Sequence, residues 1–198
     1  MKRLYIVRHG NTFDKGDTIL RVGGRTDLPL SVSGETQAAT LGAHFEERGI
    51  NPARIIVGPL KRTLQTASAI SEALGGPAPE IDERLREIDY GPDEGKPESE
   101  VIARIGLASL QAWETAARVP GGWQVDPAAL VDVWTDIIAS SEESDGDLMA
   151  VTSNGVARFA LQLATHNTNF PIKLRTGAYG VICLDNPEIH VAEWDVRP

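Results

Sequence analysis

The sequence predicts an α/β protein, a three-layer α/β/α sandwich with a largely parallel central sheet. Short apolar, β-prone runs alternate along the chain with longer segments of helical periodicity, and this alternation is typical of parallel sheets covered by helices. The chain has 198 residues, 41% of them hydrophobic, which suits one domain with a substantial core. We therefore expect residues 1–198 to form a single domain, with a helical insertion at about 97–143.

Composition excludes several classes of partner. The formal net charge is −9, which argues against nucleic acid and anionic membranes. One cysteine, Cys183, allows no internal disulfide. No apolar run approaches the roughly 20 residues that span a bilayer, and the N-terminus lacks the pattern of a signal peptide, so we expect a cytoplasmic protein. No Cys/His cluster has metal-ligand spacing, and we expect no cofactor.

The first predicted strand, residues 4–7, ends at a turn that contains Gly10. It delivers Arg8 and His9 to its carboxyl end, where open α/β sheets bind ligands. A guanidinium offers a rigid fork of donors to phosphate oxygens, and a neutral imidazole can attack phosphorus. The alternative is a strand end that merely happens to carry Arg and His, and these residues alone do not decide between the two.

A long polar loop, residues 10–30, precedes the first predicted helix. Ser31 or Ser33 can cap that helix, which should run to about residue 48 with His44 on its surface. Long loops in compact domains are often functional.

Residues 54–57 read as a strand buried on both faces. The strand leads directly into a helix within residues 58–67, so helix N–H groups and Arg62 should converge at the sheet edge and form an anion site. We expect Lys61, by contrast, to be solvated.

The remaining elements follow the same alternation. Glu87 lies in a segment between a short linker or strand and two helical stretches, and we expect Trp113, Trp123 and Trp134 to be packing residues. His166 should end the last helix, where the helix dipole favours a cation. The expected elements are a linker or strand at 78–81, helices at about 98–117 and 127–141, a strand at 147–152, a turn at 153–155, a helix at 156–165, and strands at 178–184 and 190–196 joined by 185–187.

Three strand ends and one further segment thus bring polar groups to one edge of the sheet. His9 is the candidate nucleophile, Arg8 and Arg62 are the candidate phosphate ligands, and Glu87 is the candidate acid and base. This set fits phosphoryl transfer without a metal, because the loose transition state needs positioning and positive charge. Glu87 would protonate the leaving oxygen and later activate water.

The chain resembles the histidine phosphatase superfamily, the phosphoglycerate mutase-like proteins. The family's Arg-His-Gly motif matches residues 8–10, and its Asp-x-Pro-Leu-(Ser/Thr)-x-x-Gly segment matches 27–34. Its Ser-Pro-Leu-x-Arg segment begins here with Gly58, and its Leu-x-Glu motif matches 85–87. The resemblance implies a phosphoglycerate mutase-like fold and a phosphohistidine intermediate on His9. It also implies phosphate binding by Arg8 and Arg62, and proton donation by Glu87.

The sequence departs from this family at the third parallel strand. Relatives usually carry a second pocket histidine in Val-(Ser/Thr)-His-Gly, and Ser153 stands in its place here. A Ser153 hydroxyl or an Asn154 amide can donate one hydrogen bond, but neither adds positive charge. Asn11 replaces the Glu or Gln often found after Arg-His-Gly. We expect Asn11, Thr12, Ser153 and Asn154 to bind the phosphate or the substrate. The alternative for Ser153 and Asn154 is that they only form the turn that starts the following helix, a role that both residue types favour.

These observations favour a metal-independent phosphatase acting on a small phosphorylated substrate. The departure at Ser153 keeps open a weak or inactive relative that binds a phosphorylated ligand or partner without turnover. A phosphomutase is a third possibility, disfavoured because the substrate signature of the glycolytic mutases is not evident. The sequence leaves a homodimer open.

Overall fold

A six-stranded sheet forms the centre of the computed structural model, which describes residues 2–143, 145–165, 170–185 and 188–198. The strand order is β3-β2-β4-β1-β5-β6. The strands are β1 (Lys2–Arg8), β2 (Arg54–Val57), β3 (Glu80–Ile81), β4 (Leu148–Thr152), β5 (Tyr179–Asp185) and β6 (Glu188–Val196). The pairs β1–β4, β4–β2 and β2–β3 are parallel, whereas β5 is antiparallel to both β1 and β6. The prediction of a largely parallel sheet is confirmed.

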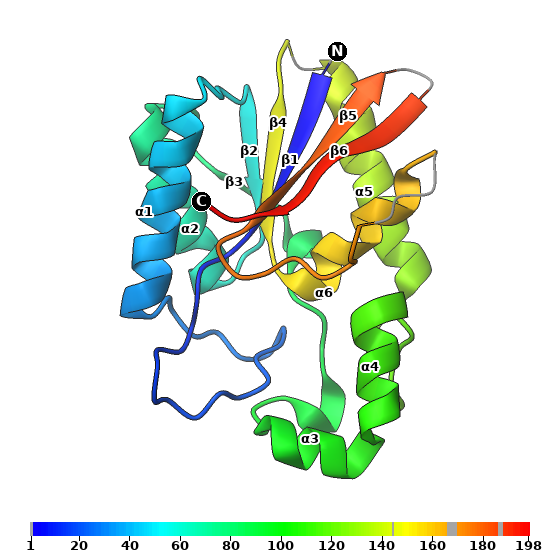
Figure 1. Ribbon diagram of the computed structural model, residues 1–198. Coiled ribbons are helices and arrows are strands. Elements are labelled where there is room, and N and C mark those ends of the chain that lie inside the picture. Colours follow the sequence, from blue (N-terminus) through cyan, green and yellow to red (C-terminus); the bar gives the residue numbers. More distant parts are fainter. Residues whose placement is uncertain (1, 144, 166–169, 186–187) are drawn as a thin grey trace.

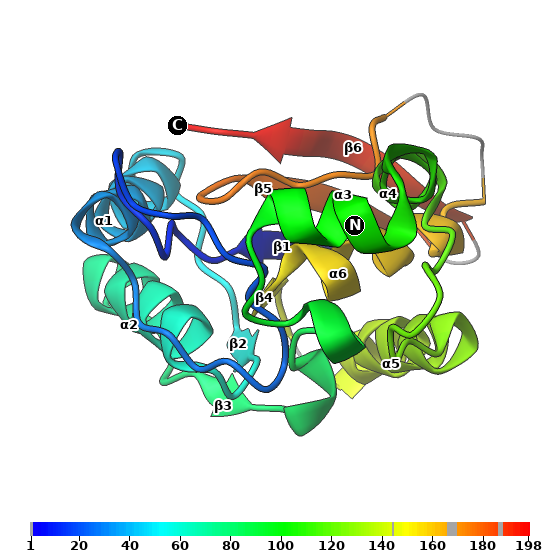
Figure 2. The ribbon, with the colours of Figure 1, turned by 90° about the horizontal axis from the view of Figure 1, so that it is seen from below.

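Helices cover both faces of this sheet (Figures 1 and 2). One face carries α1 (Val32–Glu47) and α2 (Lys61–Leu74), and the other carries α5 (Pro127–Ser140) and the short α6 (Asn154–Ala157). The helices α3 (Glu98–Ile105) and α4 (Leu107–Ala116) lie beyond the carboxyl ends of the parallel strands, where the long loop after β1 also lies (Figure 1). These two helices and this loop therefore frame the edge at which the polar groups were expected.

The side chains of β1 divide the core into two layers. Leu4 and Ile6 belong to the cluster on the α5 and α6 face, and Tyr5 and Val7 belong to the cluster under α1 and α2. All four are at most 3% exposed. Successive side chains of a strand point to opposite faces, so an uninterrupted apolar run is what a strand buried on both sides requires. This burial fixes the position of the Arg8–His9 pair at the end of β1.

Two predicted helices differ from those observed. The stretch at 98–117 is two helices, because Gly106 adopts φ +80° between α3 and α4, a conformation that glycine accepts readily and that an α-helix does not continue. The helix predicted at 156–165 starts instead at Asn154, keeps α-helical geometry for four residues, and continues as a 3₁₀ helix over Arg158–Leu163.

Smaller differences concern single residues. The last strand begins at Glu188, two residues earlier than predicted. His44 is not a plain surface residue, because its Nε2 lies 3.0 Å from the Tyr179 hydroxyl. The tryptophans 113, 123 and 134 are buried, as expected of packing residues. The predictions for His166 and for the turn at 186–187 lie outside the described residues.

Candidate active site

A cavity of about 690 Å³ opens at the carboxyl edge of the parallel strands. Seven of the residues predicted for the site line it, namely Arg8, His9, Asn11, Thr12, Arg62, Glu87 and Asn154. Parallel strands present their carboxyl ends at one edge of a sheet, so residues that are far apart in the sequence converge here. The eighth predicted residue, Ser153, does not line the cavity.

The His9 imidazole is held in one orientation by two hydrogen bonds. Its Nδ1 lies 2.7 Å from the carbonyl oxygen of Gly10 and donates to it, because a carbonyl only accepts. The Nε2 is then the unprotonated nitrogen, and it accepts a hydrogen bond from Arg62 Nε at 3.3 Å. Burial, followed by the positive charges of Arg62 and Arg8, lowers the pKa of His9 well below its ordinary value of 6.5. His9 is therefore a neutral imidazole whose Nε2 carries a lone pair.

Two glycines allow the turn after His9 to pack against the start of α1. A Cβ on Gly10 would lie 2.4 Å from the carbonyl oxygen of Gly34, and a Cβ on Gly34 would lie 2.0 Å from that of Asn11. Ser31 is the cap of α1, and its Oγ accepts from the Gly34 N–H at 3.2 Å. Two backbones that approach this closely leave no room for side chains, which explains why glycine occupies both positions.

Arg62 is 1% exposed and reaches the cavity from the first turn of α2. Its two terminal nitrogens donate to loop carbonyls, Nη1 to Thr26 at 2.8 Å and Nη2 to Gly23 at 3.2 Å. Burial lowers the pKa of this guanidinium, and the charge of Glu87 opposes that effect. Hydrogen bonds to the protein thus hold the planar guanidinium of Arg62 in one position. A guanidinium held in this way favours anion recognition.

Arg8 supplies the second guanidinium. Its Nη1 donates to the carbonyl of Leu174 at 2.7 Å, while its buried Nε has no hydrogen-bond partner among the described residues. Burial lowers the pKa of Arg8, again against the charge of Glu87. A buried donor without an acceptor is costly, so Arg8 has a hydrogen bond left to give.

An anion site was predicted at the start of α2, where one backbone N–H group already donates to a carboxylate of the protein itself. The Lys61 backbone N–H donates to Asp27 Oδ1 at 2.7 Å, so a carboxylate of the chain caps this helix terminus. The Lys61 side chain is exposed, as expected. Of residues 58–67, Arg62 is the one that lines the cavity.

Glu87 is 7% exposed, and its carboxylate accepts from two backbone N–H groups. Its Oε1 accepts from Ile88 at 2.9 Å, and its Oε2 accepts from Gly155 at 3.4 Å. A Cβ on Gly155 would lie 2.2 Å from Oε1, so glycine makes room for the carboxylate. The segment that carries Glu87 also accounts for Gly58, which stands where the family usually has serine. A Cβ on Gly58 would lie 2.6 Å from the Leu85 carbonyl oxygen.

The turn after β4 offers Asn154 to the cavity and buries Ser153. Ser153 is fully buried, its Oγ has no hydrogen-bond partner among the described residues, and it makes no side-chain cap to α6. Ser153 therefore does not face the cavity in this structure, and its contact with the substrate stays a prediction. Asn154 Oδ1 accepts from the Leu174 N–H at 2.8 Å, which leaves the Nδ2 end of this amide as the donor available to the cavity.

Several residues of the cavity wall were not predicted from the sequence. Thr176 donates from Oγ1 to Asn11 Oδ1 at 2.5 Å, and Asn11 in turn donates from Nδ2 to Ser33 Oγ at 3.0 Å. Thr176 and Lys173 precede β5 in a stretch without a recognisable motif, so no local signal points to them. The other missed side chains include Arg21, Tyr90, Glu98 and Glu114.

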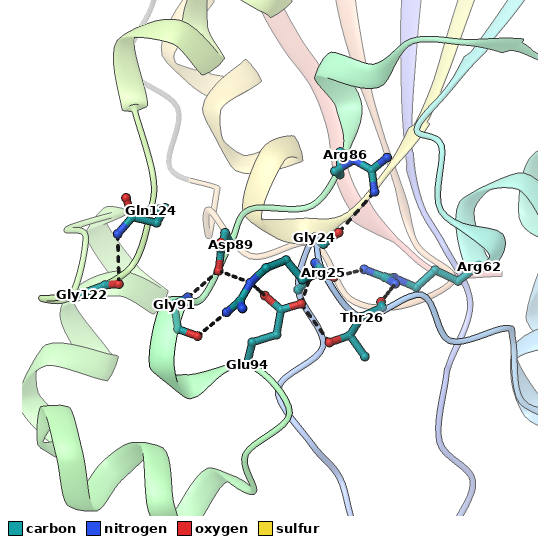
Figure 3. A network of polar contacts seen from close by, with 11 residues as sticks. Gly24, Arg25, Thr26, Arg62, Arg86, Asp89, Gly91, Glu94, Gly122 and Gln124 are labelled. Carbon is teal, nitrogen blue, oxygen red and sulfur yellow. Dashed lines mark hydrogen bonds and ion pairs between the residues drawn. The ribbon is translucent and has the colours of Figure 1, made fainter.

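A polar network holds the loop that carries Gly23 and Thr26 against the segment after Glu87 (Figure 3). Arg25 lies between Asp89 and Glu94, with Nε–oxygen distances of 3.0 and 3.5 Å. Thr26 Oγ1 donates to Glu94 at 2.8 Å. Exposed ion pairs contribute little individually, but these bonds share partners, so they order the loop whose carbonyls receive Arg62.

In the part of the chain that the structure describes, no group of three or more His, Cys, Asp or Glu residues could hold a metal ion. None of the helices there has the length and apolar character needed to cross a membrane.

The chain combines this fold with a cluster of one histidine, two arginines and one glutamate, namely His9, Arg8, Arg62 and Glu87. This combination is typical of phosphoryl-transfer proteins. The family model of the histidine phosphatase superfamily (branch 1) matches residues 4–196, and the chain belongs to this superfamily.

Similar proteins carry phosphatase and mutase names. A solved structure of mycobacterial glucosyl-3-phosphoglycerate phosphatase aligns with a TM-score of 0.79 at 21% identity, covering 100% of both chains. YhfR from Bacillus stearothermophilus aligns with a TM-score of 0.79 at 25% identity, covering 100% of this chain and 98% of that one. The "Probable phosphoglycerate mutase GpmB" of Salmonella arizonae is 40% identical over 91 residues, a match that spans 46% of this chain and only 40% of the relative's length.

Proposed function

We propose that this protein is a metal-independent phosphatase that hydrolyses small phosphomonoesters through a phosphohistidine intermediate on His9. The observation that carries the proposal is the orientation of His9, whose Nδ1–H is held by the Gly10 carbonyl while Nε2 keeps its lone pair beside Arg62. A histidine fixed in this tautomer and kept neutral by burial is suited to nucleophilic attack.

The reaction follows from the residues that line the cavity. His9 Nε2 attacks phosphorus, the P–O bond to the alcohol breaks, and protonated Glu87 gives its proton to the departing oxygen. Glu87 then takes a proton from a water molecule, which attacks the phosphohistidine. The P–N bond breaks, phosphate leaves, and His9 and Glu87 return to their starting states.

Three side chains would stabilise the charge on the transferring phosphoryl group. Arg8 has an unsatisfied Nε–H, Arg62 presents a preformed fork, and Asn154 has a free amide end. Preorganised donors of this kind stabilise developing charge without reorganisation at the moment of reaction. Arg62 Nε must leave His9 Nε2 before attack, and a phosphate oxygen is the acceptor that would replace it.

A second candidate is a protein that binds a phosphorylated ligand without turnover. It is favoured by the turn after β4, which offers the cavity the neutral Asn154 amide and no cation. A mutase is supported by the name of the Salmonella relative, although that match covers less than half of each chain.

The test is a screen of phosphomonoesters in the presence of EDTA, comparing the wild type with His9→Ala. His190→Ala is a suitable control, because His190 lies on β6 and does not line the cavity. We expect turnover by the wild type and the control and none by His9→Ala, together with an acid-labile, base-stable label on His9 after reaction with labelled substrate. Phosphoester binding without turnover by the wild type selects the binding protein, and transfer to a second alcohol selects the mutase.

A further inference from the structure

Away from the phosphate-binding residues, the cavity wall carries two cations that are each paired with a carboxylate. Arg21 Nη2 lies 2.5 Å from Glu98 Oε2, and Lys173 Nζ lies 3.0 Å from Glu114 Oε2. All four residues line the same cavity as His9. Both carboxylates come from the helices beyond the sheet edge, Glu98 from α3 and Glu114 from α4.

The Arg21 pair is built into the wall. The Arg21 side chain is 12% exposed, and its guanidinium carbon lies 5.1 Å from the ring centre of Tyr90 and 5.3 Å from that of Trp123. These aromatic faces favour a cation. Because the two rings fix the guanidinium, Arg21 cannot turn toward a ligand without losing them and Glu98 together.

The pair of Lys173 and Glu114 is more exposed to solvent, and it also places a carboxylate beside a cation on the cavity wall. The Glu114 side chain is 27% exposed and the Lys173 side chain 52% exposed. Another cation, Lys15, lines the cavity from an exposed position, where solvent and salt screen its charge. Asp14, next to Lys15 in the chain, adds a carboxylate to the same wall. The outer part of the cavity is therefore close to electrically balanced, whereas the phosphate site has the two guanidiniums of Arg8 and Arg62 and the single carboxylate of Glu87.

From this balance we infer the substrate class, an inference that rests on the proposed function. The alcohol released from the phosphate is uncharged and bears hydroxyl groups, and Glu98 and Glu114 are specificity-determining residues that reject a second anionic group. Carboxylates accept hydrogen bonds from hydroxyls, and Arg and Lys donate to them, so the paired groups suit a polyol. A carboxylate on the substrate meets the like charges of Glu98 and Glu114, and the cations beside them, Arg21 and Lys173, are each already paired with one of these carboxylates.

The test compares two ligands that differ at one carbon, glycerol 3-phosphate with CH₂OH and 3-phosphoglycerate with a carboxylate. Dissociation constants are measured in the His9→Ala background, which removes turnover, and kcat/KM is measured in the wild type. We expect glycerol 3-phosphate to be preferred in both measurements. Glu98→Gln or Glu114→Gln should raise the affinity and the kcat/KM for 3-phosphoglycerate, relative to those for glycerol 3-phosphate, by a factor on the order of two to five. This is the range expected for partly exposed charges.

Glu100→Gln is the matched control, since Glu100 lies on α3, pairs with Lys96 at 3.4 Å and does not line the cavity. Glu100→Gln should leave unchanged both the ratio of the two dissociation constants, measured in the His9→Ala background, and the ratio of the two kcat/KM values. The inference is overturned if 3-phosphoglycerate is bound as well as glycerol 3-phosphate, or if the Glu98 and Glu114 variants leave the ratio unchanged. Discrimination in binding without any hydrolysis by the wild type would contradict the proposed function alone, and binding of neither ester would overturn both.

Discussion

Arg62 and His9 are joined by a hydrogen bond from Nε to Nε2 at 3.3 Å. The acceptor in this bond is the lone pair that we propose as the nucleophile, so the guanidinium lies on the side of His9 from which we propose that phosphorus is attacked. An arriving phosphate offers Arg62 a charged acceptor, and charge-assisted hydrogen bonds are the stronger ones. Binding of the phosphate would therefore free the nucleophile in the same step.

The first prediction concerns the titration of His9. Arg62 is the largest charge contribution that lowers the pKa of His9, so Arg62→Gln should raise that pKa, measured by NMR of the imidazole. Arg84→Gln is the control, because Arg84 pairs with Asp82 and Asp136 outside the cavity. In the wild type, the acid limb of kcat/KM should lie below pH 6.5, since His9 stays neutral there. An unchanged His9 pKa in Arg62→Gln would contradict the electrostatic role.

The second prediction concerns stability as a function of pH. The native pKa of His9 is lowered from its ordinary value of 6.5, so below pH 6.5 the unfolded chain binds a proton that the native protein does not. The free energy of unfolding should fall as the pH falls below 6.5, by at most about 1.4 kcal/mol per pH unit from this group. His9→Asn should remove that contribution. Denaturant titrations that give parallel pH curves for the two proteins would refute the linkage.

The third prediction concerns the space beside Glu87. In Gly155→Ala the new Cβ would meet Glu87 Oε1 at 2.2 Å, so the carboxylate must move. Activity on alkyl phosphates, whose leaving group needs a proton, should fall by about 10²–10⁴. Activity on a nitrophenyl ester should fall much less, as it should in Glu87→Gln.

Gly76→Ala is the control for that substitution. A Cβ on Gly76 meets its nearest neighbour at 3.6 Å, an ordinary contact, so both activities should be retained. Equal losses on the two esters in Gly155→Ala would show that the substitution disturbs the fold or the phosphate site rather than proton transfer.

The fourth prediction separates the two residues of the turn after β4. Asn154→Ala removes a donor from the cavity and should lower kcat by about 10²–10³. Ser153→Ala removes a hydroxyl that is buried without a hydrogen-bond partner among the residues the structure describes, so kcat should be unchanged and the free energy of unfolding should not decrease. Steady-state kinetics and denaturant unfolding measure these effects. A loss of kcat in Ser153→Ala would return Ser153 to the site.

Strands buried on both faces were the most predictable part of the fold. The run at 54–57 contains three consecutive β-branched apolar residues, 55–57, and is followed by Gly58 and Pro59, and the observed strand β2 has the predicted bounds. The split at Gly106 was not predicted, because a helix tolerates one glycine and only tertiary packing selects its positive φ. The identity of the cap was also open, since Ser31 and Ser33 both precede the helix, and only the structure assigns the cap to Ser31.

The candidate site was predictable where polar residues follow strands and was not predictable where loops supply them. Arg8 and His9 end a buried strand, so topology alone carries them to the carboxyl edge. Whether Ser153 or Asn154 faces the cavity depends on the exact turn into α6, which a sequence pattern does not fix. Thr176 and Glu114 reach the cavity through long-range packing, for which neighbouring residues give no sign.

Arg62 has a consequence for how this protein can change during evolution. The same guanidinium that points at the nucleophile also ties down the loop carbonyls of Gly23 and Thr26. Lysine offers a point charge without a fork, so Arg62→Lys would loosen the loop even where it preserves the charge. Selection for a new substrate can therefore not tune anion affinity at this position independently of the order of the loop. We therefore expect changes of substrate to arise at positions such as Glu98 and Glu114, to which the proposed reaction assigns no step.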